Sequence, residues 1–542
     1  MDKDDCCHRI AEKQTPLSYR KILLAVISGV LLTASFPPVN LSFLSWLALV
    51  PILKSLENES PSRAFKLGFI AGAVHYLTLI YWIIVVLGRY GNLNFFFSSI
   101  PYLLLCFYLA LYPALFSLMI TFLWKSRFAL ILMGSFWVGL EYVRASFLTG
   151  FPWCLLGYTQ YKQLHLIQIA DLFGVYGLSF LIVLVNGLLY FLFFSTQRKN
   201  NTQTGGGFLK WEILITGLIT VATLVYGQYR LSEKQMEKAS RPYIRAVVIQ
   251  GNIDQSLKWD PTYQAATIAT YQRLTRETFD FKPELIVWPE TSAPFFFQDN
   301  AELSPKVVSI ARESGAALVF GSPAYKQVSG IIKHYNRAYL ISPYDRRPQY
   351  YDKMHLVPFG EYVPLKRFLY FINRLVPAAG DFAQGTEIVS LDHDNLSIGI
   401  LICFEAIFPE LARDHAMKGA NILVNITNDA WFGKTSAPYQ HLAMAVFRAV
   451  ENRRPMIRAA NTGFSAFIEP QGKIIARSGL FTEETLKISL DISKHPLTFY
   501  TRFGDLFALL LLGISLIKTF SLIKRLRNLR YLFKSKPKSL NN

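Results

Sequence analysis

The sequence predicts a multi-pass α-helical membrane bundle of eight spans that carries an outside α/β domain before its last span. Hydrophobic residues make up 52% of the 542 residues and charged residues 17%, which is too apolar for a soluble protein of this length. Long apolar segments occupy the first 230 residues and one stretch near the end. Between them, strand-like and helix-like patterns alternate, as is typical of α/β domains.

The predicted spans are segments that can bridge about 30 Å of hydrocarbon at about 1.5 Å per residue, the second only just. They lie at 21–37, 40–56, 65–87, 95–123, 127–147, 170–195, 209–227 and 503–522.

The formal net charge of +19 is concentrated beside these segments, which favours the positive-inside rule over nucleic-acid binding. Basic residues precede the first span, lie in every second connection and follow the eighth span, whereas the other connections carry few charges. Both termini are therefore predicted to be cytoplasmic and residues from about 228 to 500 to lie outside.

The predicted domain organisation follows the spans. It comprises a cytoplasmic tail (1–20), a seven-span bundle (21–227), a linker or helical neck (228–242), a catalytic domain (243–492), an eighth span with its approach (493–523) and a basic cytoplasmic tail (524–542).

Polar residues in the bundle have two open interpretations. Glu141 and Arg144 are three residues apart, on one helix face, before the loop 150–161. They either form an ion pair that steadies this loop or contact a lipid headgroup. Gly68 and Gly72 are typical of close helix packing.

In the outside domain, apolar runs predict strands and amphipathic stretches predict helices. The strands are expected at 243–250, 284–288, 317–321, 338–342, 396–402, 422–427, 463–469 and 486–490. The helices are expected at 260–280, 301–314, 405–418 and 438–453.

Three polar residues stand at predicted strand ends or in loops, and the end of a strand is where α/β sites are expected. Glu290 follows the strand at 284–288, Lys353 lies in the motif 351–361, and Cys403 ends the apolar run 396–402. Alone, each has an ordinary structural explanation: a solvated Glu, a surface Lys or an inert buried Cys. However, Cys403 is the only one of the five cysteines beyond residue 230, so its domain cannot contain an internal disulfide.

Together and in this order, WPE at 288–290, DKMHLVPFGE at 352–361 and ICFE at 402–405 resemble the nitrilase, or carbon–nitrogen hydrolase, superfamily. With the membrane spans, the whole chain resembles the apolipoprotein N-acyltransferases, a resemblance that QGNIDQSLKWD at 250–260 and ITNDAWFG at 426–433 strengthen. Phe404 departs from the pattern, because Tyr often follows the cysteine in this family.

The resemblance implies an αββα sandwich and a Glu–Lys–Cys triad that needs no metal or cofactor. Glu290 would be the general base, Lys353 would stabilise the thiolate and the oxyanion, and Cys403 would be the nucleophile. Glu361, Glu405, Trp259 and Phe404 are implied as supporting or substrate-binding residues.

The implied reaction is the last step of lipoprotein maturation, in the bacterial inner membrane with the catalytic domain in the periplasm. Cys403 would take an acyl chain from a phospholipid, typically phosphatidylethanolamine, as a thioester. The chain would then pass to the α-amino group of a diacylglyceryl-cysteine at an apolipoprotein N-terminus.

Other interpretations remain open. His355 could pair with the cysteine in place of the Lys-containing triad, and the segment 363–377 is either a mobile interfacial arm or a buried helix. Rival functions are a membrane-tethered amidase for small amides and a non-enzymatic transporter or binding protein. The apolar spans argue against the amidase, and the complete triad argues against the binding protein.

Overall fold

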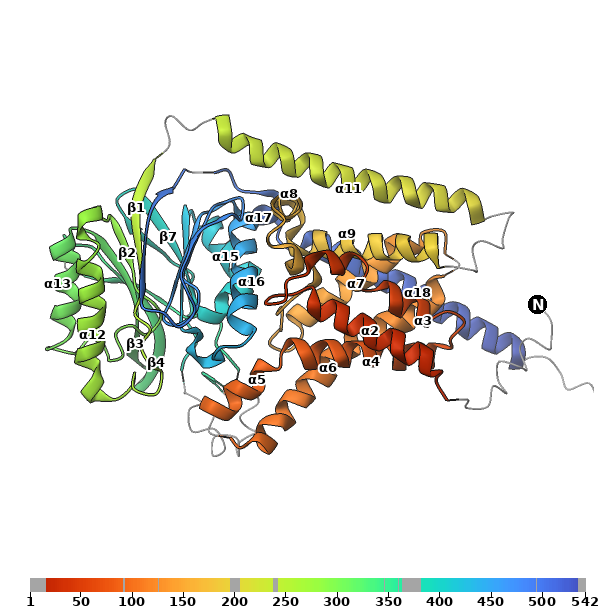
Figure 1. The fold of residues 1–542 in the computed structure, drawn as a ribbon, viewed down its shortest axis with the longest axis horizontal. Coiled ribbons are helices and arrows are strands. Elements are labelled where there is room, and N and C mark those ends of the chain that lie inside the picture. The colour runs from red at the N-terminus through yellow and green to blue at the C-terminus, as the bar shows by residue number, and fades with distance from the viewer. Residues whose placement is uncertain are drawn as a thin grey trace, which may run out of the picture.

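The computed structural model of this chain describes residues 16–90, 93–124, 126–194, 205–236, 242–345, 347–358, 360–362, 382–493 and 495–534. A helical bundle and an α/β sandwich lie at opposite ends of an elongated molecule (Figure 1). The arm predicted at 363–377 lies outside the described residues.

The bundle is built from the apolar segments of the first half of the chain and from the helix that follows the sandwich. Its elements are α2 (Tyr19–Ala34), a 3-10 helix (Ser42–Trp46), α3 (Val50–Ser55), α4 (Pro61–Leu79), α5 (Trp82–Val85), α6 (Phe95–Leu123), α7 (Ala129–Ser146), a 3-10 helix (Leu156–Gln160), α8 (Leu164–Ile167), α9 (Ala170–Phe193), α11 (Gly205–Met236), α17 (Phe499–Phe503) and α18 (Leu506–Lys534).

Four of the described helices are long and apolar enough to cross a membrane: α6, α9, Lys210–Ser232 within α11 and Leu506–Arg525 within α18. The pair Pro61–Leu79 and Trp82–Arg89 also qualifies when taken together, with a 46° bend between its halves. The segment 40–56, in contrast, is not one continuous helix. Its described helical part, Ser42–Ser55, is too short for about 30 Å of hydrocarbon, and the eight-span count stays a prediction.

The two glycines of α4 have the packing role that their spacing predicts. A Cβ on Gly68 would lie 2.5 Å from Pro113 O, and one on Gly72 would lie 2.9 Å from Ala110 Cα, both on α6. The absence of side chains therefore lets the backbones of α4 and α6 approach closely.

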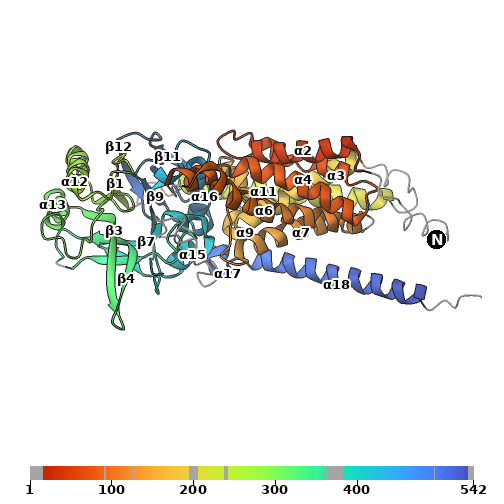
Figure 2. The ribbon, with the colours of Figure 1, turned by 90° about the horizontal axis from the view of Figure 1, so that it is seen from below.

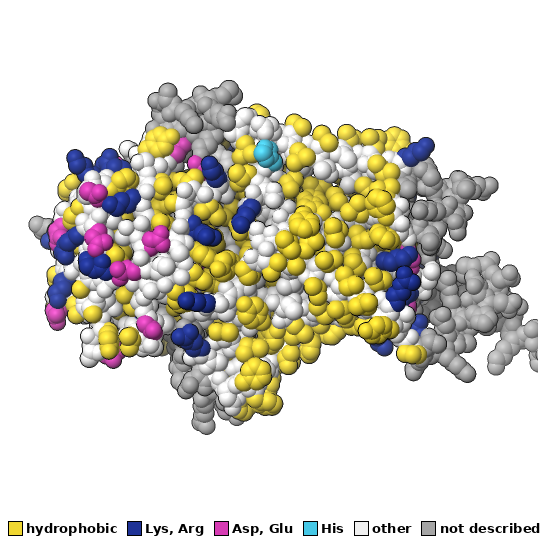
Figure 3. Space-filling view, viewed as in Figure 1, with side chains coloured by type: hydrophobic (Ala, Val, Ile, Leu, Met, Phe, Trp, Pro, Cys, Tyr) yellow, Lys and Arg dark blue, Asp and Glu magenta, His cyan; other side chains and the backbone are white. Residues whose placement is uncertain are grey.

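The surface of the bundle is largely hydrophobic. Figure 3 shows hydrophobic side chains over the face of the bundle in view, whereas acidic and basic side chains mix on the sandwich. Exposed apolar residues lie on α6, α11 and α18, among them Leu104, Trp211, Leu218, Ile517 and Phe520. A contiguous apolar surface of this kind is expected of a protein half that faces lipid.

The sandwich consists of two six-stranded sheets. The strand order in the first sheet is β12-β1-β2-β3-β4-β5 and in the second β11-β10-β9-β8-β7-β6. The strands are β1 (Tyr243–Gln250), β2 (Leu285–Val287), β3 (Ala317–Val328), β4 (Ile331–Ile341), β5 (Gln349–Asp352), β6 (Ser390–His393), β7 (Leu396–Ile402), β8 (Ile422–Thr427), β9 (Met456–Ala460), β10 (Ala466–Ile468), β11 (Ile474–Arg477) and β12 (Glu484–Asp491).

Helices cover both outer faces of the sandwich (Figure 1). They are α12 (Pro261–Arg276) and α13 (Ser304–Ser314) on the first sheet, and α15 (Pro409–Met417) and α16 (Ala437–Asn452) on the second. Between the sheets lies a core of β-branched and aliphatic residues, including Val248, Val287, Ile400 and Val424. The αββα arrangement that the family resemblance implies is therefore present.

Parallel pairing brings several strand ends to the same edge of each sheet. β1, β2 and β3 are parallel, as are β7, β8 and β9, and β5 runs in the direction of β3 because β4 is antiparallel to both. The carboxyl ends of these strands are where the polar residues of a site gather in such folds.

The helix predicted at 405–418 is wrong in its first part. Residues Cys403–Ile407 form a 3-10 helix, and α15 begins only at Pro409. Phe408 has an extended conformation (ψ 107°), because a residue before proline avoids the α region. The chain therefore leaves β7 through a short turn at Cys403, which we call the elbow, and not directly through a long helix.

The sandwich rests on the bundle through α15, α16 and the loop that follows α7, while α18 runs along the outside of the bundle beside α7 (Figure 2). Glu141 accepts hydrogen bonds from Trp137 Nε1 (3.0 Å) and Leu156 N (2.8 Å), whereas Arg144 donates to Tyr76 OH (2.7 Å). Glu141 therefore steadies the loop after α7 through the loop backbone and a neighbouring indole, whereas the expected ion pair between Glu141 and Arg144 is not formed between these two described residues.

Candidate active site

The carboxyl group of Glu290 lies in the loop that follows β2. Gly321 makes room for this loop, since a Cβ there would lie 2.8 Å from Glu290 Cα. Asn336 Nδ2 donates to Glu290 Oε1 over 2.8 Å, while Oε2 is buried without a hydrogen-bond partner among the described residues. An unoccupied carboxylate oxygen in a buried site is able to accept a proton from a substrate or a thiol.

Lys353 directly follows β5, and its side chain is 1% exposed. Its Nζ lies 2.9 Å from each carboxylate oxygen of Glu361 and 3.9 Å from Glu290 Oε1. Burial lowers the pKa of Lys353, but Glu361 and Glu290 outweigh burial and raise the pKa above its usual value. The ammonium therefore stays charged between the two carboxylates.

Cys403 directly follows β7 and begins the 3-10 turn with φ +52°, a conformation that non-glycine residues rarely adopt. Its carbonyl oxygen accepts hydrogen bonds from His441 Nε2 (3.1 Å) and Asn425 Nδ2 (3.4 Å). Burial and the Glu290 carboxylate raise the pKa of the thiol, although Lys353 lowers it. The resting group is thus a thiol, and it needs a base when it attacks.

Glu405 fixes the elbow to the lysine loop. Its Oε1 accepts from Tyr351 OH (3.0 Å), Met354 N (2.6 Å) and His355 N (3.0 Å), and its Oε2 accepts from Ile402 N (2.7 Å). These bonds tie the strand before Cys403 to the segment just after Lys353, so Glu405 acts by positioning them.

Glu361 orients Lys353 and also accepts from Asn336 Nδ2 (2.9 Å) and Val357 N (2.8 Å). Asn336 therefore bridges both carboxylates that surround the lysine. Sequence reasoning missed Asn336, because an Asn within a strand carries no motif of its own.

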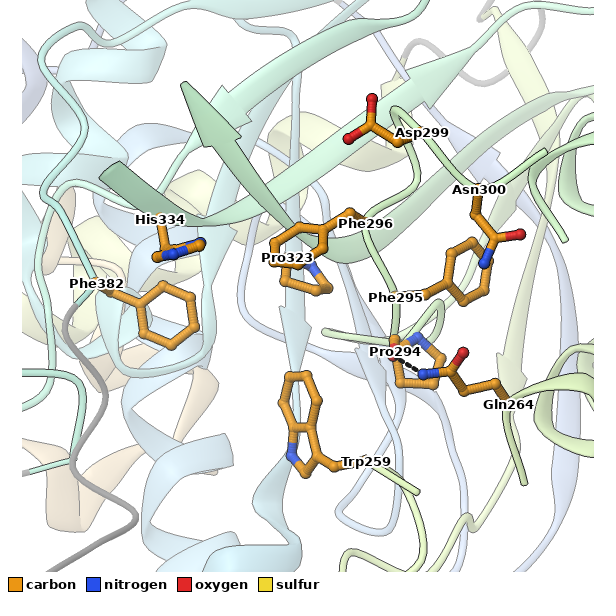
Figure 4. Close-up of a pocket in the computed structure, with 10 residues that line it drawn as sticks. All are labelled: Trp259, Gln264, Pro294, Phe295, Phe296, Asp299, Asn300, Pro323, His334 and Phe382. Atoms are coloured by element: carbon orange, nitrogen blue, oxygen red, sulfur yellow. Dashed lines mark hydrogen bonds between the residues drawn. The ribbon is translucent and has the colours of Figure 1, made fainter. Parts of the chain in front are cut away.

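Phe404 and Trp259 lie in different places. The Phe404 ring packs against Trp153 from the loop after α7 (centroids 6.5 Å apart) and against Phe408 (5.2 Å). Trp259 is 48% exposed and lines a pocket of about 660 Å³ (Figure 4). Aromatic and proline side chains form most of the wall opposite Trp259, notably Phe296 and Pro323.

A buried polar cluster lies beneath Cys403. Asp429 accepts from Arg458 Nη2 (2.8 Å) and Thr427 Oγ1 (3.0 Å), and His441 Nδ1 lies 3.1 Å from Asp429 and 3.0 Å from Arg458. Asp429 lies in the motif at 426–433 but was not singled out from the sequence, and its partners on α16 and β9 come from distant sequence and carried no signal of their own.

The competing pairing of His355 with Cys403 finds no support. The imidazole stacks on Phe408 with ring centroids 3.7 Å apart. Burial and the neighbouring Lys353 lower the pKa of His355 to about 4.

Family comparisons agree with these features. The family model for the apolipoprotein N-acyltransferase N-terminal domain matches residues 28–188, and the model for carbon–nitrogen hydrolases matches residues 245–495. An apolipoprotein N-acyltransferase of Geobacter metallireducens is 44% identical, covering 90% of this chain and 92% of that protein. One of Haemophilus influenzae is 32% identical, covering 94% of this chain and 97% of that protein. This chain therefore belongs to the apolipoprotein N-acyltransferase family.

Proposed function

We propose that this enzyme N-acylates the N-terminal diacylglyceryl-cysteine of bacterial apolipoproteins, with a phospholipid as acyl donor. The observation that carries the proposal is that Cys403, Glu290 and Lys353 are buried within electrostatic reach of one another, in a sandwich that packs on an apolar bundle. Family membership over nearly the whole chain supports the same reaction.

In the first half-reaction, the Cys403 sulfur attacks the carbonyl carbon of an acyl ester, and the thiol proton passes to Glu290 Oε2. Lys353 stabilises the negative charge that develops on the carbonyl oxygen. The ester C–O bond then breaks, Glu290 returns the proton to the leaving oxygen, and a lysophospholipid departs from the thioester.

In the second half-reaction, the α-amino group of the apolipoprotein attacks the thioester. Glu290 accepts a proton from the amine, the C–S bond breaks, and the thiol regains that proton from Glu290. The product is an amide, and the enzyme returns to its starting state with no external oxidant or reductant.

We also propose where the enzyme lies in the cell and which phospholipid donates the acyl chain. Eight spans, cytoplasmic termini and a periplasmic sandwich in the inner membrane agree with the distribution of basic residues along the sequence. Phosphatidylethanolamine is the proposed donor headgroup. A membrane-tethered amidase would use the same triad but has no evident need for so large a lipid-facing surface.

The test is to trap the acyl-enzyme. Purified protein is incubated with phosphatidylethanolamine or phosphatidylglycerol in mixed micelles, and the peptide containing Cys403 is analysed by mass spectrometry. A diacylglyceryl peptide is then added, and its N-acylation is followed. We expect an acyl adduct on Cys403 that transfers to the peptide and is absent in Cys403→Ala.

The two phospholipids separate the general claim from the headgroup claim. Equal labelling by both would remove the preference for phosphatidylethanolamine only. Turnover of a small soluble amide without any acyl adduct from phospholipid would overturn the proposed function.

A further inference from the structure

A second lysine lies at the active site, in the loop that follows β1. Lys258 is 1% exposed, and its Nζ donates to the backbone oxygen of Glu290 over 3.0 Å. Among the described residues, this carbonyl is the hydrogen-bond acceptor of the Lys258 side chain. The backbone of Lys258 is fixed as well, since its N–H donates to Asp254 O over 3.1 Å.

The charges around the triad explain why a second cation is needed. Glu361 and Glu290 are both carboxylates, and Lys353 is shared between them at 2.9 and 3.9 Å. One ammonium for two carboxylates leaves a net negative charge beside Cys403, which opposes removal of the thiol proton. Lys258 brings this group of four charges to neutrality.

The surroundings of Lys258 agree with this role. Burial lowers the pKa of Lys258 to about 8, while Glu290 and Cys403 raise it. A buried ammonium is costly unless nearby groups stabilise it, and these two groups are members of the triad. The Glu290 carboxylate thus offsets part of the cost of burying this charge beside the triad.

We propose that Lys258 is a positioning residue for acyl transfer, which fixes the backbone of Glu290 and supplies the positive charge that Lys353 shares with Glu361. The proton that leaves Cys403 still goes to Glu290 Oε2, and Lys258 keeps its own protons throughout. The inference rests on the proposed function, since it concerns the same thiol and the same base.

The experiment measures the reactivity of Cys403 without a lipid substrate. Intact protein in detergent is treated with iodoacetamide, and alkylation of the Cys403 peptide is timed by mass spectrometry over a range of pH. The variants are Lys258→Met, which removes the charge at similar length, and Lys258→Arg, which keeps it. Lys306→Met is the matched control, because Lys306, on α13, forms an exposed ion pair with Glu302.

We expect alkylation at neutral pH to be at least about tenfold slower in Lys258→Met, since one unit in the thiol pKa changes the thiolate fraction about tenfold. Lys258→Arg should recover most of the rate, and Lys306→Met should match the unchanged protein. The thermal unfolding midpoint identifies any variant that fails to fold. Lys258→Gln then replaces Lys258→Met.

The acyl-transfer rate provides a second readout. It should fall as the pH rises through about 8, where Lys258 loses its proton, and Lys258→Arg should keep its rate to higher pH. The site also contains the ionisable groups Glu290, Glu361, Lys353 and Cys403. All four are present in the unchanged protein and in Lys258→Arg.

An unchanged pH profile of alkylation in folded Lys258→Met would overturn the inference and leave Lys258 a structural residue. That result is distinct from failure of the proposed function. In the latter case the unchanged protein itself would form no acyl adduct from phospholipid, whatever residue stands at position 258.

Discussion

Gln440 and His441 are adjacent residues on α16, yet they bind opposite halves of the molecule. Gln440 Oε1 accepts hydrogen bonds from the indoles of Trp82 (3.2 Å) and Trp153 (2.8 Å) in the bundle half. His441 Nε2 donates to the carbonyl of Cys403 over 3.1 Å. One turn of helix therefore connects the bundle to the nucleophile, so displacement of the sandwich on the bundle would disturb the elbow.

Replacing Gln440 tests this connection. Gln440→Leu leaves the two indole N–H groups buried without an acceptor, which costs about 1–3 kcal/mol for each. We expect a lower thermal unfolding midpoint and a slower acyl transfer, measured in detergent. Gln272→Leu is the matched control, because Gln272 makes an exposed hydrogen bond to Lys306 O. Equal effects of the two substitutions would contradict the connection.

Replacing His441 tests the support of the elbow. Burial and the adjacent Arg458 lower the pKa of His441, so the neutral ring can donate through Nε2–H to Cys403. His441→Phe removes this donor, and we expect kcat to fall roughly 10- to 100-fold, as for the loss of about 1.5–3 kcal/mol, with little change in KM. His441→Gln, which can donate in the same direction, should recover part of kcat. A change confined to KM would contradict this role.

Removing the charge of Glu361 should change the pH dependence of catalysis. In Glu361→Gln, burial acts on Lys353 with less opposition, so the pKa of Lys353 falls. Lys353 is useful while protonated, below its pKa, and its contribution is lost as the pH rises through that value. Lys258→Arg removes the alkaline loss that Lys258 causes near pH 8, and in this background we expect Glu361→Gln to move the remaining alkaline loss of kcat to lower pH. Glu302→Gln is the control, because Glu302 is exposed and lies just before α13. An alkaline loss of kcat at unchanged pH would refute the role of Glu361.

Much of the fold could be predicted because strongly apolar runs leave little choice of structure. β1, β7 and β8 begin and end at the predicted residues, since β7 and β8 are buried on both faces and β1 is buried from Ala246 onward. β5, β6, β9 and β11 were missed. Ser390–His393, for example, is a short edge strand whose polar sequence carries no alternation to detect.

The residues of the site also divide into those that the sequence predicts and those that it does not. Glu290, Lys353 and Cys403 were predicted from motifs at strand ends or in loops, and the structure places Lys353 beside Glu290 and puts both in the electrostatic surroundings of the thiol. Their catalytic roles stay predictions until they are tested. Lys258 stands in the motif at 250–260 but was not singled out there, and His441 carried no motif of its own, because only the folded chain brings these single polar groups to the triad.

The Glu405 carboxylate accepts four hydrogen bonds from groups on both sides of the site. Glu405→Gln replaces one acceptor oxygen with an amide donor that faces N–H or O–H groups. At least two bonds should be lost, at about 1–3 kcal/mol for each donor left unsatisfied.

Because Met354 N and His355 N are among these donors, the segment after Lys353 should move away from Cys403. We expect Glu405→Gln to lower the thermal unfolding midpoint. It should also slow formation of the acyl-enzyme more than it slows transfer of the acyl chain to the peptide, with formation measured by single-turnover labelling of Cys403. Glu410→Gln, at the start of α15, is the control within the same region. Full labelling rates in Glu405→Gln would mean that the elbow and the lysine loop are held together without this carboxylate.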